Sequence, residues 1–347
     1  MRAPVAALVL AAAAASAMPE VVRGVWSGWG KYAGRWEEAV SALEQFSVNL
    51  LMPNLIYGCA AAFDTDLLPS NLNSLQGGDY VRECVDACHC RGIEVHAWVI
   101  LWKTNLNDSS FVDSMRKEGR TQVSSDGSMS AWLCPTDPDN RELMLSLIGE
   151  LARGYDLDGI QLDYVRFPDR SHCFCPGCRE RFEEATGILV REWPGQVLEG
   201  GRYREEFLEW RSGTITAFVR DVRDLVDAES PGTLLSVAVL PDLEDAMGNG
   251  QDWPDWAAEG LVDFIVPMDY TDSLELFGQM LDTQLALAGE VPVVPGIGSN
   301  AAGLDLTPDE ISCQMEAAIR AGAAGWALFH LNSTLLEVKL PAVEFPG

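Results

Sequence analysis

Histidine is scarce in this chain of 347 residues, which holds four of them. They stand at His89, His96, His172 and His330, and no H-x-H or H-E-x-x-H pattern joins any two. Metal-dependent hydrolases build their sites from clustered histidines and carboxylates. The scarcity therefore argues against a catalytic metal, and with it against a metal-dependent hydrolase of another bond, such as a deacetylase.

Two further enzyme signatures are missing. The G-x-S-x-G turn that presents a nucleophilic serine does not occur. Gly28-Trp29-Gly30 begins like the phosphate-binding turn G-x-G-x-x-G, but Ala33 takes the place of the third glycine. A doubly wound open sheet, the main alternative fold, would need that turn after an early strand. The sequence thus favours neither a serine hydrolase nor a nucleotide-binding sheet.

Basic residues are also few, with 24 Lys and Arg against 52 Asp and Glu and a formal net charge of −28. A chain this acidic repels nucleic acid and anionic membranes, so neither is expected as a partner. The charge suits a soluble protein that handles neutral or cationic substrates. Adaptation to a saline habitat would produce the same composition.

Long apolar runs are absent apart from one short stretch near the amino terminus. Arg2 precedes apolar residues from Val5 to Ala15, and Ala15-Ser16-Ala17 has the small-x-small pattern of a cleavage site. The stretch is shorter than the ~20 residues of a membrane-spanning helix. We expect a signal peptide at residues 1–17 and a secreted or periplasmic protein without a membrane span, the alternative being an Ala-rich disordered leader.

Strand-like and helix-like segments alternate along the rest of the chain. Strands are expected at Val22–Trp29, Asn49–Ile56, Glu94–Trp102, Gly159–Phe167, Leu234–Leu240, Asp263–Met268, Val291–Ile297 and Gly325–Leu331. Helices are expected between them at Trp36–Phe46, Tyr80–Cys90, Asp139–Gly154, Glu205–Asp227, Trp253–Gly260, Leu274–Ala288 and Pro308–Ala321. This alternation predicts a single (β/α)8 TIM barrel over residues 18–347, with a truncated last helix. Long loops should follow strand three, at 103–134, and strand four, at about 169–202.

The segment Asp158–Pro168, with the sequence DGIQLDYVRFP, is the most informative of these strands. Ile160 and Leu162 mark it as buried, and Asp163 and Arg166 interrupt the apolar run. A buried aspartate is costly unless it is paired or used. Either Asp163 forms an internal ion pair with Arg166, or it is a carboxylate at the carboxyl end of a strand, where barrel enzymes place their catalysts.

Carboxylates and flat aromatic rings gather at the predicted strand ends, a combination typical of carbohydrate chemistry. Asp163 and Asp269 are the expected catalytic pair, with Asp163 as nucleophile or base, Asp269 as its acid partner, and Arg166 keeping Asp163 ionised. Asp269 could instead cap a helix, and single tryptophans could be core residues. The substrate-binding candidates are Arg166, Trp29, Tyr57, Trp98, Trp102, Asp242, Tyr270, Asn300, Trp326 and His330.

The nine cysteines allow either metal binding or disulfides. Cys173, Cys175 and Cys178 follow His172 closely, and zinc needs four sulfur or nitrogen ligands, of which C-x-x-C supplies two. A second C-x-x-C is absent, and an exported protein can oxidise its thiols. The odd count leaves at least one cysteine without a disulfide partner. Structural zinc, disulfides and free thiols all remain open at this cluster.

Asp158–Pro168 resembles the D-G-I-x-x-D-Y-x-R-[YF]-P strand of the bacterial glycosyl hydrolase-like 10 family. Trp132–Arg141, WLCPTDPDNR, is similar to that family's W-L-x-P-x-x-P-x-x-R segment, and the resemblance extends from about Val21 to Asn332. It implies a (β/α)8 barrel that acts on glycans in the envelope or outside the cell, and some relatives act on peptidoglycan strands. Asp163 and Arg166 occupy family motif positions.

The sequence therefore predicts an exported, metal-independent glycoside hydrolase that acts on a polysaccharide or oligosaccharide, cell-wall glycan included. A non-catalytic glycan-binding TIM barrel is the alternative, because no glutamate ends strand four, five or six. No cofactor is expected apart from zinc at the cysteine cluster. The oligomeric state is left open.

Overall fold

The computed structural model describes residues 18–58, 60–73, 77–104, 109–301 and 303–346. The predicted signal peptide at residues 1–17 lies outside the described residues. Among those that are described, no helix combines the length and the apolar character needed to cross a membrane.

Eight strands form the barrel, which confirms the predicted architecture. They are β1 (Val22–Ser27), β2 (Leu50–Tyr57), β5 (Glu94–Ile100), β8 (Gly159–Asp163), β9 (Leu234–Val239), β10 (Phe264–Pro267), β11 (Gly296–Ile297) and β12 (Gly325–Leu331). They pair in parallel in the order β10-β9-β8-β5-β2-β1-β12-β11. Parallel bridges from Ile265 to Val293 and from Met268 to Gly296 join the two ends of this order. The ring of strands is therefore nearly closed.

The strands are buried on both faces, as a barrel covered by helices requires. In β2, every residue from Leu50 to Ile56 is buried. Side chains alternate between two clusters: Trp26, Met52 and Trp98 belong to the cluster inside the barrel, while their strand neighbours pack outward under the helices. This alternation decides which strand-end residues reach the barrel mouth.

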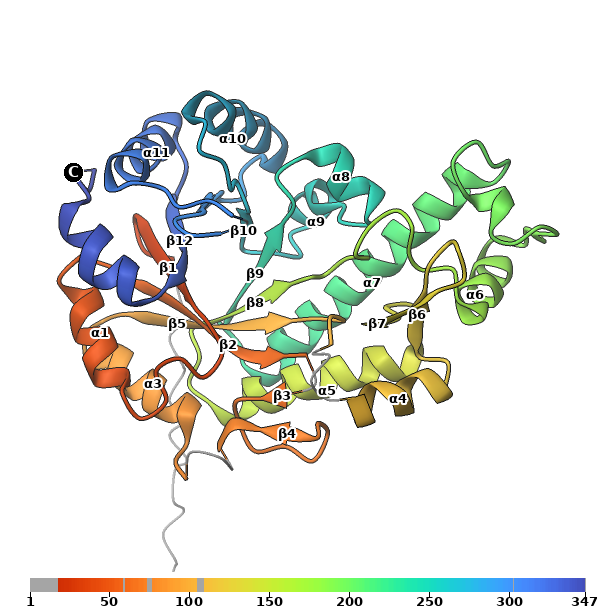
Figure 1. The fold of residues 1–347 in the computed structure, drawn as a ribbon, viewed down its shortest axis with the longest axis horizontal. Helices are drawn as coiled ribbons and strands as arrows, with labels where there is room; N and C mark the ends of the chain where they lie inside the picture. Colours follow the sequence, from red (N-terminus) through yellow and green to blue (C-terminus); the bar gives the residue numbers. More distant parts are fainter. Residues whose placement is uncertain (1–17, 59, 74–76, 105–108, 302, 347) are drawn as a thin grey trace, which may run out of the picture.

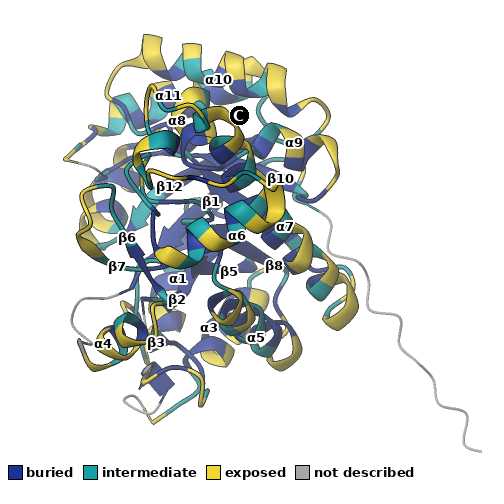
Figure 2. Ribbon diagram, turned by 90° about the vertical axis from the view of Figure 1, so that its right-hand side faces the viewer, coloured by how far each residue is buried: buried dark blue, intermediate teal, exposed yellow. Residues whose placement is uncertain are grey.

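The helices that cover the barrel are α1 (Trp36–Glu44), α3 (Tyr80–His89), α5 (Pro138–Gly154), α7 (Arg204–Glu229), α8 (Leu243–Gly248), α9 (Trp253–Ala258), α10 (Leu274–Ala288) and α11 (Pro308–Ala321). Their inner faces are buried and their outer faces exposed (Figure 2). In α11, Thr307 and Glu310 form a capping box and Pro308 occupies the first turn, which fixes where the helix begins. Among the residues described after β12, the helical segments are the short turns Leu335–Lys339 and Leu340–Ala342, so the last helix is truncated as predicted.

The two segments expected to be irregular loops contain short ordered elements. The first holds α4 (Ser109–Lys117) and the antiparallel pair β6 (Thr121–Val123) and β7 (Met129–Leu133), and the second holds α6 (Pro176–Thr186) and a turn at Gly195–Val197. Elements this short carry too little periodicity to be read from sequence. Two further short strands, β3 (Ala60–Ala61) and β4 (Ser70–Asn71), follow β2.

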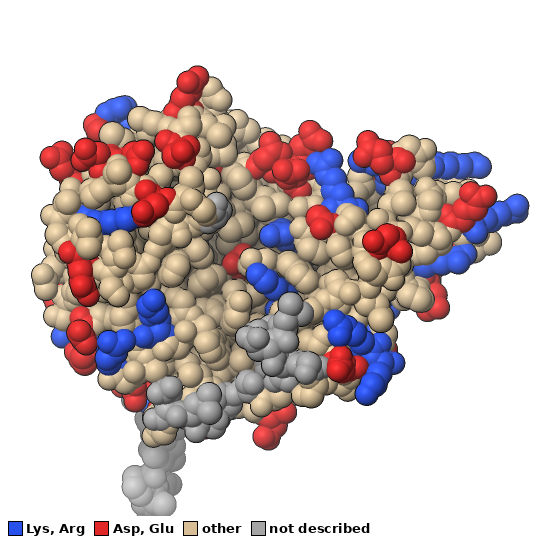
Figure 3. Space-filling view, in the orientation of Figure 1, with Lys and Arg blue, Asp and Glu red and all other residues tan. Residues whose placement is uncertain are grey.

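The segments that hold β6, β7 and α6, together with the start of α7, form a lobe on the side to which β2, β5 and β8 point (Figure 1). The lobe has an aromatic cluster of its own, built on Phe174, Phe182 and Phe207. Acidic side chains are spread over the barrel helices and the lobe, with basic ones interspersed (Figure 3). On that face the negative charge therefore does not mark a single binding surface.

Candidate active site

Asp163 is the last residue of β8, where the strand reaches the carboxyl-end face of the barrel. The next residue, Tyr164, has a φ of 56°, in the left-handed region that side chains larger than glycine rarely adopt. The chain therefore leaves the strand at Tyr164 instead of continuing to Phe167 as expected. Asp163 stays at the strand end, as predicted, and Arg166 falls in the loop that follows.

A cavity of about 330 Å³ opens beside Asp163 at the carboxyl ends of the strands. Aromatic side chains make up much of its wall, and Asp163 and Lys103 are its charged residues among those described. The residues that line it are Trp26, Tyr57, Trp98, Ile100, Lys103, Asp163, Tyr164, Ala238, Met268, Tyr270, Ala301 and Phe329. Flat rings around one carboxyl group suit a sugar ring, whose apolar face packs on aromatic side chains.

Both oxygens of Asp163 accept hydrogen bonds from groups fixed by the fold. The indole Nε1 of Trp98 donates to Oδ2 at 2.9 Å, and the backbone N–H of Tyr164 donates to Oδ1 at 2.7 Å. The side chain is 5 % exposed. Burial raises the pKa of Asp163, and it outweighs the two hydrogen bonds and the positive charges of Arg166 and Lys103, which lower it. The environment thus favours the protonated carboxyl more than water does.

Arg166 does not form the internal ion pair with Asp163 that the sequence left open. Its Nη1 donates instead to the carbonyl oxygens of Phe167 and Pro168, at 3.1 Å each, and its guanidinium lies 5.1 Å from the centre of the Tyr164 ring. The positive charge of Arg166 lowers the pKa of Asp163, as expected, but burial raises that pKa by more, so the net shift is upward. Arg166 supports the loop after β8 and is not among the cavity residues.

Asp269, the expected partner of Asp163, faces away from the cavity. Met268 and Tyr270 line the cavity, so the alternation of side chains sends Asp269 between them to the other side. There it is completely buried, and its Oδ1 accepts a 2.7 Å hydrogen bond from Nε2 of Gln284 on α10. It does not cap α10 either, because that role belongs to Ser273. The structure therefore does not bring the two predicted catalytic carboxyls together.

Burial also shapes the acidity of Asp269. It raises the pKa of this carboxyl to about 7, although the hydrogen bond from Gln284 lowers it. Oδ2 has no hydrogen-bond partner among the described residues. Ionisation of a buried carboxyl that has an unpaired oxygen is destabilising. We therefore expect Asp269 to make the stability of the protein depend on pH.

Three of the other substrate-binding candidates, Tyr57, Trp98 and Tyr270, do line the cavity. Trp29, Asn300 and His330 are half-buried outside its wall, and Oδ1 of Asn300 accepts a 2.9 Å hydrogen bond from the backbone N–H of His330. Tyr57, Trp98 and His330 belong to strands, while Trp29, Tyr270 and Asn300 lie in the connections that follow strands.

The remaining candidates are structural. Trp102 packs under α7, with its ring 4.8 Å from that of Phe218, and Trp326 is fully buried outside the barrel interior. Asp242 accepts a hydrogen bond from the backbone N–H of Asp245 and so caps α8. Trp102 and Trp326 are thus core residues, the alternative that the sequence left open for single tryptophans, and Asp242 is a helix cap outside the described cavity wall.

The cavity residues that sequence reasoning missed include Trp26, Lys103, Tyr164 and Phe329. Trp26 and Phe329 lie on inward-facing strand positions, so strict counting along β1 and β12 could have found them. Nothing in the local sequence identifies Lys103 or Tyr164, because both depend on how the chain turns after a strand.

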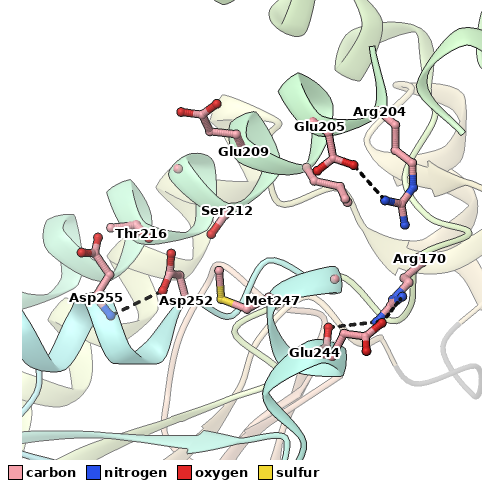
Figure 4. A pocket seen from close by; sticks show the side chains of 13 residues that line it. Arg170, Arg204, Glu205, Glu209, Ser212, Thr216, Glu244, Met247, Asp252 and Asp255 are labelled. Carbon is pink, nitrogen blue, oxygen red and sulfur yellow. Dashed lines mark hydrogen bonds and ion pairs between the residues drawn. The ribbon is translucent and has the colours of Figure 1, made fainter. Parts of the chain in front are cut away.

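A larger hollow of about 620 Å³ lies between α7 on one side and α8 and α9 on the other (Figure 4). Its polar lining is mostly acidic, and Arg170 and Arg204 are bound to Glu244 and Glu205 across or along its rim. None of its lining residues belongs to a barrel strand. The aromatic cavity, not this hollow, occupies the place where barrel enzymes carry out their reactions.

Cys173, Cys175 and Cys178 lie together, as the zinc prediction requires, and a fourth cysteine, Cys134, joins them. His172 does not: its Nδ1 lies 2.9 Å from Oδ1 of Asp169. In the cavity, by contrast, Asp163 is the one carboxylate among the described lining, which contains neither histidine nor cysteine. The groups that could hold a metal are thus separate from the cavity.

Comparison with known proteins agrees with this geometry. The profile of the family described as "Glycosyl hydrolase-like 10" matches residues 29–294. The chain belongs to this family. The matched region contains both sequence segments on which the resemblance was based, and it includes Asp163 and most of the cavity wall.

Individual relatives cover the chain in part. Over 233 residues it is 22% identical to "Glycosyl hydrolase DigH" of Escherichia coli K12, an alignment that covers 59% of this chain and 49% of that protein. It is 32% identical over 107 residues to an "S-layer-related protein" of Niallia circulans, covering 28% of this chain and 7% of the other. The chain thus spans half or less of the length of these relatives.

Among solved structures, the PgaB (BpsB) glycoside hydrolase domain from Bordetella bronchiseptica superposes with a TM-score of 0.73. The two share 12% sequence identity, and the superposition covers 93% of this chain and 97% of that domain. At this identity the likeness establishes the fold, a TIM barrel of the kind found in glycosidases.

Proposed function

We propose that this protein is an exported glycoside hydrolase that cleaves O-glycosidic bonds of a polysaccharide or oligosaccharide, with Asp163 as its general acid. The observation that carries the proposal is a carboxyl group with a raised pKa, set in an aromatic cavity at the carboxyl ends of the barrel strands. Membership of the glycosyl hydrolase-like 10 family supports the reaction class. Export rests on the amino-terminal sequence pattern of residues 1–17.

The chemistry follows from the surroundings of Asp163. A protonated carboxyl beside a glycosidic oxygen donates its proton as that oxygen leaves the anomeric carbon, which a raised pKa favours. Water adds to that carbon and releases a proton, so the net reaction is hydrolysis. Once the proton has left, the N–H groups of Trp98 and Tyr164 stabilise the carboxylate through the hydrogen bonds described above. The rings of Tyr57, at the end of β2, and Tyr270, just after β10, also line the cavity and would pack on the sugar.

We further propose that this reaction needs no metal ion. Divalent ions at hydrolytic sites are held by several carboxylate or histidine ligands. The described lining of the cavity offers the carboxylate of Asp163 and the cation of Lys103, which is a poor donor set for an ion.

A glycan-binding barrel without catalytic activity is the second candidate. Glycoside hydrolysis ordinarily uses two carboxyl groups on either side of the bond. Asp163 is the one carboxyl among the described residues that line the cavity, and Asp269 faces the opposite side of its strand. This observation favours binding without turnover.

The deciding experiment compares the wild-type protein with Asp163→Asn on a panel of polysaccharides that includes peptidoglycan strands stripped of their peptides. Release of reducing sugar and direct binding are measured on the same substrates. Asparagine keeps the shape of the side chain and removes its proton-donating ability, so the variant should bind glycan and fold as the wild type does.

The result separates the two candidates. Sugar release by wild type with a loss of about 100-fold or more in Asp163→Asn would support the hydrolase. Full activity in the variant would contradict the role of Asp163. Binding of one glycan by both proteins, with no product after long incubation, would establish the binding-protein alternative.

A further inference from the structure

Four buried cysteines from two distant parts of the chain meet in the lobe beside the barrel mouth. Cys134 follows β7, while Cys173, Cys175 and Cys178 come from the segment after β8. The Sγ atoms all lie within 4.8 Å of one another. All four thiols are free and fully or almost fully buried. We call these residues the tetracysteine cluster.

The spacing of the sulfurs fits a metal centre better than it fits disulfides. Sγ of Cys134 lies 3.5 Å from Sγ of Cys178 and 3.8 Å from Sγ of Cys175. A tetrahedral site with zinc–sulfur bonds of about 2.3 Å has sulfur–sulfur edges of about 3.8 Å. Bonded disulfide sulfurs stand about 2.05 Å apart. Four thiols at tetrahedral spacing leave room for one ion between them.

Backbone and hydroxyl groups already hydrogen-bond these sulfurs. The N–H groups of Val123 and Cys178 point at Sγ of Cys173 and Sγ of Cys175, at 3.3 Å each. The Thr136 hydroxyl lies 3.2 Å from Sγ of Cys134 and 3.3 Å from Sγ of Cys178. Such outer contacts orient metal ligands and disperse the negative charge of thiolates.

Two arginines beside the cluster lack carboxylate partners. Arg211 is 1 % exposed, its Nη2 donates to the carbonyl oxygen of Asp169, and its guanidinium stacks on Phe167 at 4.1 Å. Arg181 reaches Sγ of Cys134 at 4.0 Å. Asp169 and Asp137 act on Arg211 and Arg181 through charge, but among the described residues neither carboxylate forms an ion pair with these arginines. Thiolates in the cluster would add negative charge beside both cations, which neutral thiols do not supply.

We propose that Cys134, Cys173, Cys175 and Cys178 bind one zinc ion as a closed tetrathiolate site. Four thiolates around a divalent ion carry a net charge of −2, which the two neighbouring arginines offset. Because all four positions are taken by protein, the site is structural and leaves no coordination position for substrate.

The site would fix one wall of the cavity. It ties the segment after β5 to the segment after β8, which are also joined by backbone hydrogen bonds from Phe174 to Val123 and from Ser125 to Ser171. Trp132 lies two residues before Cys134, and its ring packs 5.3 Å from that of Tyr164, a residue of the cavity wall. Loss of the ion should therefore loosen the lobe and, through Tyr164, the entrance to the cavity.

The test measures metal content by mass spectrometry of the full chain purified without chelators. We expect about one zinc per chain. Cys134→Ser and Cys178→Ser should each lose most of it, while Cys84→Ser, which alters a buried cysteine of α3 outside the cluster, should keep it. Chelator treatment of the wild-type protein should lower its melting temperature and expose the four thiols to alkylation.

A second measurement avoids dependence on variants that fail to fold. Exchange of the wild-type protein with cobalt should give the absorption of a tetrahedral thiolate complex, which reports ligand type and geometry directly. A disulfide between any two of the four residues after rapid alkylation, full zinc in Cys134→Ser, or iron in place of zinc would each overturn the proposal.

Discussion

The indole N–H of Trp98 donates a 2.9 Å hydrogen bond to Oδ2 of Asp163 across the neighbouring strands β5 and β8. Both side chains lie on the inward faces of their strands, so the bond joins a ring of the cavity wall to the carboxyl at its base. A donor held by a barrel strand cannot turn away when the carboxylate forms. The relationship links the packing of the barrel interior directly to the acidity of Asp163.

Replacing Trp98 by phenylalanine should shift the pH dependence of hydrolysis. The variant loses a hydrogen bond that lowers the pKa of Asp163, so that pKa rises further. If the protonated carboxyl is the active form, the fall in kcat/KM at alkaline pH should move to higher pH. The measurement is a pH profile of kcat/KM for both proteins.

Trp256→Phe is the matched control for this change. It also removes a buried indole hydrogen bond, from Nε1 to Oγ1 of Thr216 at 2.8 Å, but at α9, outside the cavity. Its pH profile should be that of the wild type. Identical shifts in both variants would show that the effect comes from general loosening and not from Asp163.

The positive charge of Lys103 should also influence the pKa of Asp163. Its Nζ lies 3.3 Å from Oη of Tyr164, and its positive charge lowers the pKa of Asp163. Lys103→Met should therefore also move the alkaline limb to higher pH, and the difference from wild type should shrink as salt screens the interaction. Lys117→Met, at an exposed position on α4, is the control, and an equal response there would refute the specific interaction.

Asp269 should make the protein less stable as the pH rises from about 4 to about 7. Its pKa in the folded protein is about 7, against an ordinary value of 3.8, so folding favours its protonated form. The folded state keeps this advantage below the ordinary value and loses it as the pH passes through the raised one. The loss is on the order of 4 kcal/mol in the free energy of unfolding.

Asp269→Asn should remove this dependence of the free energy of unfolding on pH. Asparagine is neutral and can still accept the hydrogen bond from Gln284, so the variant should be more stable than wild type at pH 8 and retain its activity. Denaturant unfolding at several pH values measures this, with Asp242→Asn at an exposed helix cap as control. A folded but inactive Asp269→Asn protein would contradict the placement of Asp269 outside the cavity.

Substitutions at Tyr57 and at Trp326 should have different effects, the first on substrate binding and the second on stability. Tyr57 lines the cavity, so Tyr57→Ala should raise KM by up to about 10-fold through loss of a ring that packs on the sugar. Trp326 is buried with its ring 6.0 Å from Phe345, so Trp326→Phe should lower the melting temperature and leave KM unchanged. A raised KM in Trp326→Phe would restore the original prediction of substrate contact there.

The residues on which the sequence prediction succeeded share a physical basis. Apolar runs such as those around Ile160 and Leu51 can be buried on both faces only in a covered parallel sheet, and their alternation with helices leaves few folds. Asp163 stood out because a buried carboxylate within an apolar strand is destabilising unless it is paired or has a function. Asp269 followed an apolar run in the same way, yet its neighbours Met268 and Tyr270 take the inward positions.

By itself, therefore, the sequence determined the (β/α)8 barrel, its family and one carboxyl of the site, because periodicity and a local motif are properties of neighbouring residues. The tertiary structure decided which strand-end side chains face the cavity, and that burial outweighs Arg166 at Asp163. It also decided that Cys134 joins cysteines at least 39 positions away. These outcomes depend on the turn at Tyr164 and on contacts between distant segments, which no local pattern encodes.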